Sequence, residues 1–421
     1  MCVTRLIFNR PFIVTCSPLI GLDLKAFSLQ SAGIGRYTIN LVKQLLIRER
    51  FSYQGFASPK TDLSCLSNTD MQLEKGISTK IHSTVLRSLF FLPQAVRNSK
   101  IDLLHSMDNS TIKFFFKPPC KRVVTIHDLI VFKYPEFFTR KHVAVVRNMT
   151  RIAANSADHI ITDSNASKKD ILETFPRLDP DSITDIPLAV ASDFKPADDI
   201  KTEDFFKKYQ LPNRFFLSLG TLEPRKNLKR LIEAFCLFKQ NSAYANIGLV
   251  LVGAKGWLEA NVGLDYDKMR QFNIQHLGFV EQRYLPLLYS KALAFVYPSL
   301  YEGFGLPILE AMSYGKAIIT SNSSSLPEVA GKAALYVDPL SQASIKKALC
   351  RLVDEEDLRN RLSLFALQES NQYSWEKTAS QTEKVYENLV GGNKYKPSLE
   401  ENQGDVNRSN FIVKCQNLKI Q

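Results

Sequence analysis

Two glutamates eight residues apart enclose a pair of glycines in the segment Glu302-Gly-Phe-Gly-Leu-Pro-Ile-Leu-Glu310. Gly303 and Gly305 let backbone amides approach an anion without a Cβ in the way. A helix is expected to begin directly after them, so these amides would lie at a helix N-terminus, which binds phosphate. Either glutamate alone would be an ordinary solvated acid. Their spacing, the glycines and the predicted strand–loop–helix context together favour a site where carboxylates accept hydrogen bonds from sugar hydroxyls.

A second cluster of reactive side chains occupies the segment Gly220-Thr-Leu-Glu-Pro-Arg225-Lys226-Asn227. Lys226 can act as a point charge on a diphosphate, and the Arg225 guanidinium can bind it with two N–H groups. Two adjacent cations at the positive end of a helix are unfavourable without an anion. We therefore favour a phosphate site over a pair of solvated cations.

Two weaker signals lie in the first half of the chain. Gly33 and Gly35 open a predicted helix, but Thr38 stands where a dinucleotide fingerprint needs its third glycine, so no NAD site is predicted. These glycines still permit a close backbone approach across a cleft. His127 and Asp128 follow a predicted strand. A lone histidine is more often structural, yet its place at the carboxyl end of a strand favours a functional role.

These residues are positioned by short apolar strands that alternate with amphipathic helices. The pattern predicts an α/β fold class with parallel sheets covered by helices on both faces. Ligands of such open sheets bind at the carboxyl ends of the strands, where the segments above fall. Strands are expected at 12–15, 103–104, 123–126, 159–162, 215–219, 248–252, 275–279, 292–297 and 317–321. Helices are expected at 35–48, 227–239, 306–314, 339–353, 355–367 and 374–389.

The composition limits the classes of function. Of 421 residues, 45% are hydrophobic and 23% charged, as in a globular protein with large cores. The 7 scattered cysteines contain no C-x-x-C pair, so they fit neither a disulfide framework nor a zinc site and suit a reducing cytosol. No apolar run is long enough to predict a membrane-spanning helix. We interpret the apolar N-terminal stretch as a first strand rather than a secretory signal.

The net charge of +12 favours anionic partners such as phosphorylated substrates or anionic lipid. An alternative is that the lysines and arginines only solvate helix faces. Because no zinc finger and no basic–aromatic repeat occurs, nucleic acid is the weakest of these partners, and we expect none to bind.

Taken together, four elements resemble the family 4 glycosyltransferases, in particular bacterial mannosyltransferases. They are the E-x7-E element at 302–310, GTLEPRKN at 220–227, GIGRY at 33–37 and TIHDL at 125–129. Their order and spacing hold from about residue 12 to 390, about nine-tenths of the chain. The resemblance implies the retaining GT-B architecture, in which two Rossmann-like domains face each other across a cleft.

The resemblance also implies a domain organisation. Residues 1–195 would form the N-terminal acceptor-binding domain and residues 196–372 the C-terminal donor-binding domain. A crossover helix at 373–392 would return to the first domain, and a polar tail at 393–421 is expected to be disordered. The proline-containing segment 179–212, which lacks an apolar period, is the expected linker.

By the same resemblance, each motif residue has a role at a nucleoside-diphosphate sugar. Glu310 would bind the ribose and Glu302 the transferred sugar. Lys226 and Arg225 would hold the diphosphate, and His127 would lie beside the transferring sugar. Of these, the implied catalytic residues are His127, Glu302, Lys226 and Arg225. The other implied donor contacts are made by backbone amides and glycines, at Gly33, Gly35, Gly220, Gly303, Phe304, Gly305 and Leu306.

The chain departs from the family pattern at two positions. Many members carry arginine directly after the glycine that matches Gly220, where this chain has Thr221, and we expect Arg225 to supply the missing guanidinium. Many members also carry an acid at the end of the first strand, where we place Thr15. The second departure concerns the floor of the cleft and leaves the donor motif intact.

The implied reaction passes through an oxocarbenium-like state while a nucleoside diphosphate leaves. Its main requirement is to stabilise negative charge on the leaving group, which Lys226, Arg225 and the loop amides can do. No D-x-D motif lies in a plausible strand-end context, so we expect no metal and no other cofactor. Because no covalent nucleophile is evident, we favour departure and attack on the same face of the sugar.

The donor is expected to be a GDP-sugar or a UDP-sugar, with GDP-mannose first. The expected acceptor is a surface polysaccharide or lipid-linked glycan, reached from the cytoplasm by an enzyme that contacts the anionic inner face of the plasma membrane. Two other functions remain open, a nucleotide-sugar epimerase of the same fold and a non-catalytic glycan-binding protein. The sequence leaves the base, sugar, linkage and oligomeric state undetermined.

Overall fold

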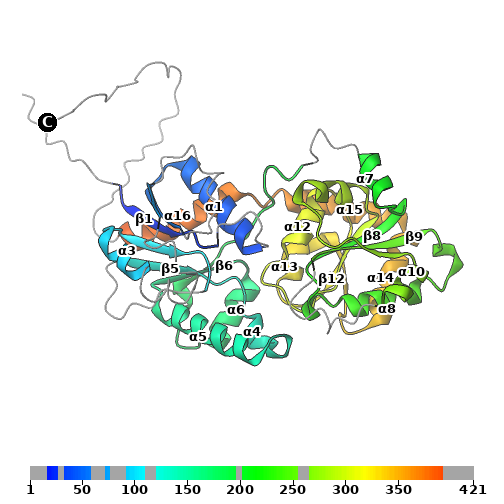
Figure 1. Ribbon diagram of the computed structural model, residues 1–421, viewed down its shortest axis with the longest axis horizontal. Helices are drawn as coiled ribbons and strands as arrows, with labels where there is room; N and C mark the ends of the chain where they lie inside the picture. The colour runs from blue at the N-terminus through cyan, green and yellow to red at the C-terminus, as the bar shows by residue number, and fades with distance from the viewer. Residues whose placement is uncertain are drawn as a thin grey trace, which may run out of the picture.

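The computed structural model describes residues 17–26, 33–57, 72–75, 92–109, 120–195, 202–254 and 265–391. Within these ranges the chain forms two α/β units that lie side by side, each built on its own parallel sheet (Figure 1). The α/β fold class predicted from the alternating pattern is therefore confirmed. No helix among these residues is long and apolar enough to cross a membrane.

The first sheet has seven strands in the order β3-β2-β1-β4-β5-β6-β7, and every neighbouring pair is parallel. Each parallel pair needs a crossover, which places helices on both faces of the sheet. Its strands are β1 (Leu19–Asp23), β2 (Ser52–Ala57), β3 (Gln72–Lys75), β4 (Leu103–Ser106), β5 (Lys121–Thr125), β6 (His159–Thr162) and β7 (Ile183–Asp185).

The helices of the first unit differ in how fully they are buried. Helix α1 buries an apolar face that includes Tyr37, Leu41 and Leu45. Helix α5 buries only Thr150, Ala153 and Ala154, so most of its surface faces solvent. The helices are α1 (Gly33–Arg48), α3 (Leu92–Asn98), α4 (Ile130–Lys133), α5 (Arg140–Ser156) and α6 (Asn165–Thr174).

The second sheet has six parallel strands in the order β10-β9-β8-β11-β12-β13. Strand β9 (Ile247–Val252) is buried at every residue, as expected for a parallel strand covered on both faces. The other strands are β8 (Arg214–Leu219), β10 (Ile274–His276), β11 (Ala294–Tyr297), β12 (Ile318–Ser321) and β13 (Ala334–Val337).

The helices around the second sheet follow the apolar periods of the sequence. In α8 (Leu228–Phe238) the buried side chains recur at helical spacing and form one stripe. The remaining helices are α7 (Thr202–Lys208), α10 (Tyr266–Gln271), α11 (Leu285–Lys291), α12 (Leu306–Ser313), α13 (Leu326–Ala330), α14 (Gln342–Asp354) and α15 (Glu356–Ser370).

The last described helix, α16 (Trp375–Val390), leaves the second unit and packs against α1 and strands β4 and β5 of the first (Figure 1). Its buried Glu383 accepts a hydrogen bond from Arg48 at 2.8 Å. The Tyr386 hydroxyl lies 2.6 Å from Nδ1 of the fully buried His105. The first unit thus obtains part of its core from the far end of the chain.

The structure corrects two expectations about the first half. The strand expected at 12–15 lies outside the described residues. The described strand β1 ends at Asp23, so a buried acid does stand at the end of the first described strand. The linker expected at 179–212 contains strand β7, which pairs with β6, and helix α7. A three-residue strand is too short to produce a detectable period. The domain limits at 195 and 372 stay a prediction.

Candidate active site

The motif residues of the second unit lie at the carboxyl ends of β8 and β11. Lys226 follows β8 in a short 3-10 turn (Pro224–Lys226), and Glu302 lies in the loop between β11 and α12. The backbone N–H of Leu300 donates to the carbonyl of Arg225 at 2.8 Å, which ties the two loops together. Gly305 precedes α12 with φ +103, a backbone conformation that disfavours any side chain.

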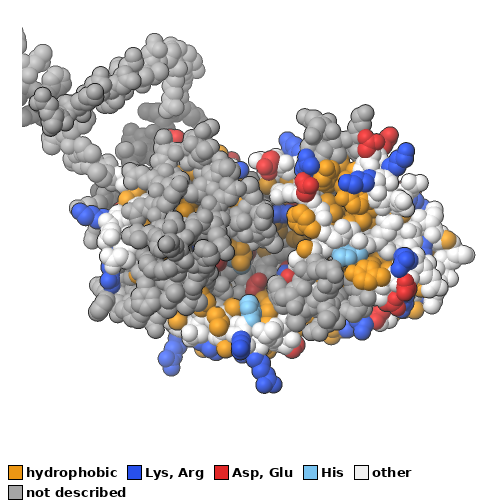
Figure 2. All heavy atoms as spheres, in the orientation of Figure 1, with side chains coloured by type: hydrophobic (Ala, Val, Ile, Leu, Met, Phe, Trp, Pro, Cys, Tyr) orange, Lys and Arg blue, Asp and Glu red, His pale blue; other side chains and the backbone are white. Residues whose placement is uncertain are grey.

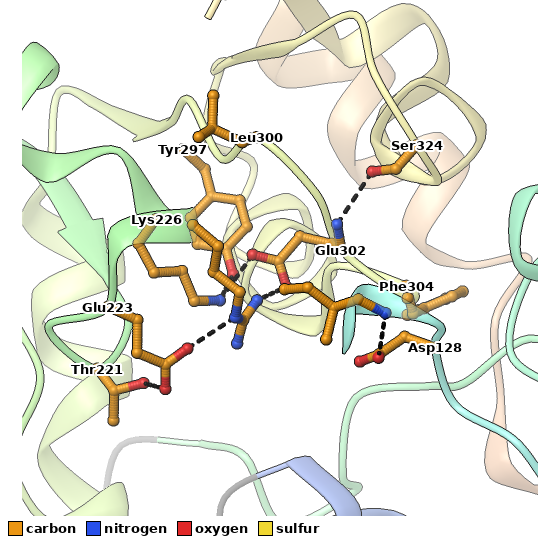
Figure 3. Close-up of polar contacts among 12 residues, drawn as sticks. Asp128, Thr221, Glu223, Lys226, Tyr297, Leu300, Glu302, Phe304 and Ser324 are labelled. Carbon is orange, nitrogen blue, oxygen red and sulfur yellow. Dashed lines mark hydrogen bonds and ion pairs between the residues drawn. The ribbon is translucent and has the colours of Figure 1, made fainter. Parts of the chain in front are cut away.

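A compact ion cluster joins these two loops (Figure 3). Glu302 accepts hydrogen bonds from Lys226 Nζ at 2.7 Å and from Arg225 Nη1 at 2.5 Å. Arg225 Nε also donates to Glu223 at 2.7 Å, and Lys226 Nζ donates to the Tyr297 hydroxyl. The two cations of the predicted phosphate segment therefore lie together, and the carboxylates of Glu302 and Glu223 hold them.

Burial and charge set the protonation states in this cluster. Burial would raise the pKa of Glu302, but Arg225 and Lys226 lower it to about 2. Burial and the neighbouring Arg225 charge lower the pKa of Lys226 to about 8, against the opposing effect of Glu302. At neutral pH the Glu302 carboxylate is ionised and the Lys226 ammonium is charged. Because its pKa is lowered, the ammonium loses its proton more readily than an ordinary lysine. An additional anion at this position would stabilise the protonated lysine.

Glu310, on α12, faces the first unit. One of its oxygens accepts from Arg36 Nη1 of α1 at 2.5 Å and the other from the Tyr289 hydroxyl at 2.9 Å. Burial raises the pKa of Glu310, against the effect of Arg36. The pair brings the GIGRY segment and the E-x7-E element together across the cleft.

His127 lies at the cleft edge, but both of its ring nitrogens face acceptors. Nδ1 is 2.7 Å from the Asp163 carboxylate, and Nε2 is 3.0 Å from the Met107 carbonyl. A ring with an acceptor at each nitrogen satisfies both only as an imidazolium. Burial would lower the pKa of His127, but Asp163 and the Met107 carbonyl raise it to about 9. In this arrangement the ring has no nitrogen available to take a proton.

The two units are in direct contact at the loop that contains Gly303. A Cβ on Gly303 would lie 2.2 Å from the His127 carbonyl oxygen, so no larger residue fits there. Ser164, the N-cap of α6, and Ser167 both donate to the Gly303 carbonyl, at 2.6 Å and 3.1 Å. The contact holds the Glu302 loop against the turn that carries His127.

The remaining predicted donor residues contribute backbone. Gly33 and Gly35 form the first turn of α1, beside the Arg36–Glu310 pair. Gly220 directly follows β8 and lies next to the Lys226 side chain. The Phe304 side chain is buried against Tyr373, so only its backbone is available to a ligand, and Leu306 begins α12.

Several residues in contact with the site were not predicted from the sequence. Tyr289 and Tyr297 are buried aromatic residues that bond Glu310 and Lys226, and nothing in their local pattern distinguishes them from core residues. Asp163, which pairs with His127, directly follows strand β6. Its position at a strand's carboxyl end was a signal that could have identified it.

Comparison with known proteins shows which family the chain belongs to. Residues 199–368 match the family described as "Glycosyl transferases group 1", and residues 31–194 match "Glycosyltransferase Family 4". The chain is 31% identical to the O-antigen chain mannosyltransferase B of Escherichia coli over 85% of its own length and 96% of the relative's. These findings give no support to an epimerase or to a protein without catalytic activity.

Solved structures share the fold at low sequence identity. The sucrose-phosphate synthase of Thermosynechococcus elongatus superposes with a TM-score of 0.68 at 18% identity, over 89% of this chain and 99% of the other. The Anabaena protein HepE, in complex with UDP and glucose, gives 0.67 at 16% identity, over 88% and 99%. Two parallel sheets facing each other, the paired motif loops and these likenesses agree that the chain is a GT-B glycosyltransferase that belongs to family 4.

Proposed function

We propose that the enzyme transfers mannose, with retention, from a nucleoside-diphosphate sugar to the end of a surface polysaccharide or lipid-linked glycan. The observation that carries this proposal is the cluster of Arg225, Lys226 and Glu302 at the carboxyl ends of β8 and β11. Paired cations fit a diphosphate, and a carboxylate beside them fits sugar hydroxyls. Mannose and a polysaccharide acceptor are supported by the name of the Escherichia coli relative.

The donor would replace hydrogen bonds and ion pairs that the site residues already make with one another. In the proposed complex the diphosphate takes over Lys226 and Arg225 from Glu302, which then accepts hydrogen bonds from the transferred sugar. Glu310 exchanges its bond with Arg36 for the ribose hydroxyls. The backbone at Gly220, Gly33, Gly35 and 303–306 lines the path of the diphosphate, and no larger side chain fits at Gly303.

The chemical step needs charge stabilisation on the leaving diphosphate. Arg225 and Lys226 supply it from fixed positions within a buried loop pair, and such groups contribute most in a water-excluded site. We propose that these cations act without a metal ion. Transfer activity that persists in EDTA would support this, and activity restored only by added Mg²⁺ or Mn²⁺ would contradict it.

Guanosine is the proposed nucleoside of the donor. The Escherichia coli relative, which matches along most of the chain, is named a mannosyltransferase, and we expect GDP-mannose as the donor here. The competing base is uridine, which the HepE complex contains. Calorimetric titration with GDP, UDP, ADP and their sugar conjugates separates the two. Tight binding of one nucleotide, lost in Glu310→Ala and Lys226→Ala, is the expected result. Absence of binding by the folded protein would contradict the proposed function.

Product analysis tests the reaction itself. Incubation with GDP-mannose and a mannose-terminated oligosaccharide should lengthen the oligosaccharide by one hexose, seen by mass spectrometry, with an α linkage seen by NMR. A donor sugar that is isomerised without acceptor would instead indicate the epimerase.

We also propose that the enzyme works in the cytoplasm against an anionic membrane surface. Helix α5 carries the exposed basic residues Arg140, Lys141 and Arg151, and Figure 2 shows Lys and Arg side chains projecting from this edge of the first unit. Basic clusters of this kind bind anionic headgroups. Sedimentation with phosphatidylglycerol vesicles, and not with phosphatidylcholine vesicles, is expected; equal sedimentation with both would contradict the proposal.

A further inference from the structure

Asp128 projects from the first unit onto the catalytic loop of the second. One of its oxygens, Oδ1, accepts the backbone N–H of Ile130 at 3.0 Å. Among the residues that the structure describes, no hydrogen bond reaches the other oxygen, Oδ2. Its Cβ is 2.9 Å from the place that a Cβ on Gly303 would take, and Figure 3 shows the side chain beside Phe304, next to the ion cluster. The carboxyl group therefore lies where the acceptor-binding and donor-binding units meet.

The other carboxylates of the site already bond neighbouring side chains. Glu302 is bound by Lys226 and Arg225, and Glu310 by Arg36 and Tyr289. Asp163 is committed to His127, whose own ring has no free nitrogen. Among these acids, Asp128 and Asp163 each keep one oxygen without a hydrogen-bond partner. The Asp163 oxygen, Oδ1, is buried, whereas Asp128 is only partly buried and can be reached by an acceptor.

The electrostatic surroundings make Asp128 more basic than Glu302. The charged and titratable groups that face it are His127 on its own turn and Arg225, Glu302 and Tyr301 from the second unit. Burial raises the pKa of Asp128 and the Glu302 charge adds to this, against the effects of the Ile130 N–H, Arg225 and His127. A carboxylate with a raised pKa is a better proton acceptor at neutral pH.

We propose that Oδ2 of Asp128 accepts the proton of the attacking acceptor hydroxyl. The hydroxyl oxygen forms the new bond to the anomeric carbon as its proton passes to Asp128. The bond from that carbon to the diphosphate oxygen breaks, and its electron pair leaves with the diphosphate beside Arg225 and Lys226. The protonated carboxyl then releases its proton to solvent. This inference rests on the proposed transfer reaction.

A purely structural role for Asp128 is the competing explanation, because Oδ1 already binds the first turn of α4. The Asp128→Asn variant separates the two. Its amide oxygen can still accept the Ile130 N–H, so the turn is kept, while the proton-accepting carboxylate is lost. Asp170→Asn is the matched control, because Asp170 accepts the Tyr301 hydroxyl at 2.7 Å across the same interface and pairs with Lys133 rather than with the ion cluster.

The experiment compares full-length wild type, Asp128→Asn and Asp170→Asn in three measurements: nucleotide binding, transfer to the oligosaccharide, and the pH profile of transfer. For Asp128→Asn we expect unchanged nucleotide affinity and thermal stability, a fall in kcat for transfer of about a hundredfold or more, and loss of the acidic limb of the profile. Asp170→Asn should retain that limb and most of the transfer activity.

The experiment distinguishes a failure of the proposed function from a failure of the role assigned to Asp128. If wild type binds no nucleotide and transfers no sugar, the proposed function itself is wrong. If wild type transfers sugar and Asp128→Asn does so at the same rate with the same pH profile, the assignment of Asp128 is overturned while the function stands. A glycosyl group trapped covalently on Asp128 would also overturn it, because the residue would then be a nucleophile.

Discussion

The two sides of the cleft each hold a buried ion cluster, and the two clusters differ in how their side chains are bonded. In the second unit, Glu302 is shared by Arg225 and Lys226, all three from loops at strand ends. In the first unit, the His127 ring lies between the Asp163 carboxylate and the Met107 backbone carbonyl. In the proposed complex the first arrangement exchanges its carboxylate for a diphosphate, whereas in the second both ring nitrogens are already bonded. A residue's position beside a cleft therefore does not establish reactivity, and its remaining hydrogen-bonding capacity decides.

Removing an exchangeable cation should have the largest effect. We expect Lys226→Ala to lower kcat/KM for transfer by about a hundred- to a thousandfold, because the leaving diphosphate loses a fixed positive partner. Lys133→Ala is the control, since Lys133 also pairs with two carboxylates, Asp170 and Glu173, but at a partly exposed site. Steady-state kinetics on both variants test this. Equal losses would show that the Lys226 position has no special role.

Moving the Gly303 loop away from the first unit should reduce transfer activity almost as much. Gly303→Ala places a Cβ against the His127 carbonyl oxygen, so the loop must shift away from the first unit. We expect transfer to fall about a hundredfold, because small misplacements of reacting groups are costly, while nucleotide binding to the second unit persists. Gly391→Ala, where a Cβ would meet nothing within 4 Å, is the control. Full transfer activity in Gly303→Ala would mean that this close contact is not needed.

Removing the Asp163 carboxylate from its pair with His127 should lower the free energy of unfolding. The pKa of His127 is raised from 6.5 to about 9 in the fold, so its contribution is fully present below pH 6.5 and is lost as pH rises through 9. That shift corresponds to about 3 kcal/mol. We expect Asp163→Asn to be destabilised by a similar amount near pH 6 and by much less near pH 10. Urea unfolding at both pH values measures this, with Asp158→Asn, at the more exposed pair with Lys121, as the control.

The smallest expected effect is the pH dependence of donor affinity. The pKa of Lys226 is lowered to about 8, so the ammonium that binds the diphosphate is present below pH 8 and is progressively lost above it. Nucleotide affinity should be flat below pH 8 and fall by up to about tenfold for each pH unit above it. In Lys226→Arg the guanidinium stays charged, so this fall should disappear. An unchanged fall in Lys226→Arg would assign it to another group.

The same contrast separates what the sequence could predict from what it could not. In the second unit, strand β8 ending at Gly220 and helix α12 beginning after Gly305 were expected, because apolar runs and glycines are local signals. The Arg36–Glu310 pair joins residues 274 positions apart, and no local pattern predicts such a contact. His127 was chosen by its position alone. Its two hydrogen-bond acceptors became apparent only when strands β4, β5 and β6 lay side by side.

The return of α16 to the first unit sets the order in which the protein can be completed. Tyr386 and Glu383 fill positions beside His105 and Arg48, so the first unit lacks these partners until the ribosome has synthesised the whole of the second. The half that is synthesised first therefore gains the last part of its core only after α16 has been made. For the same reason the enzyme cannot be divided into two working halves at the chain between the sheets. A divided form needs α16 to be supplied to the N-terminal piece.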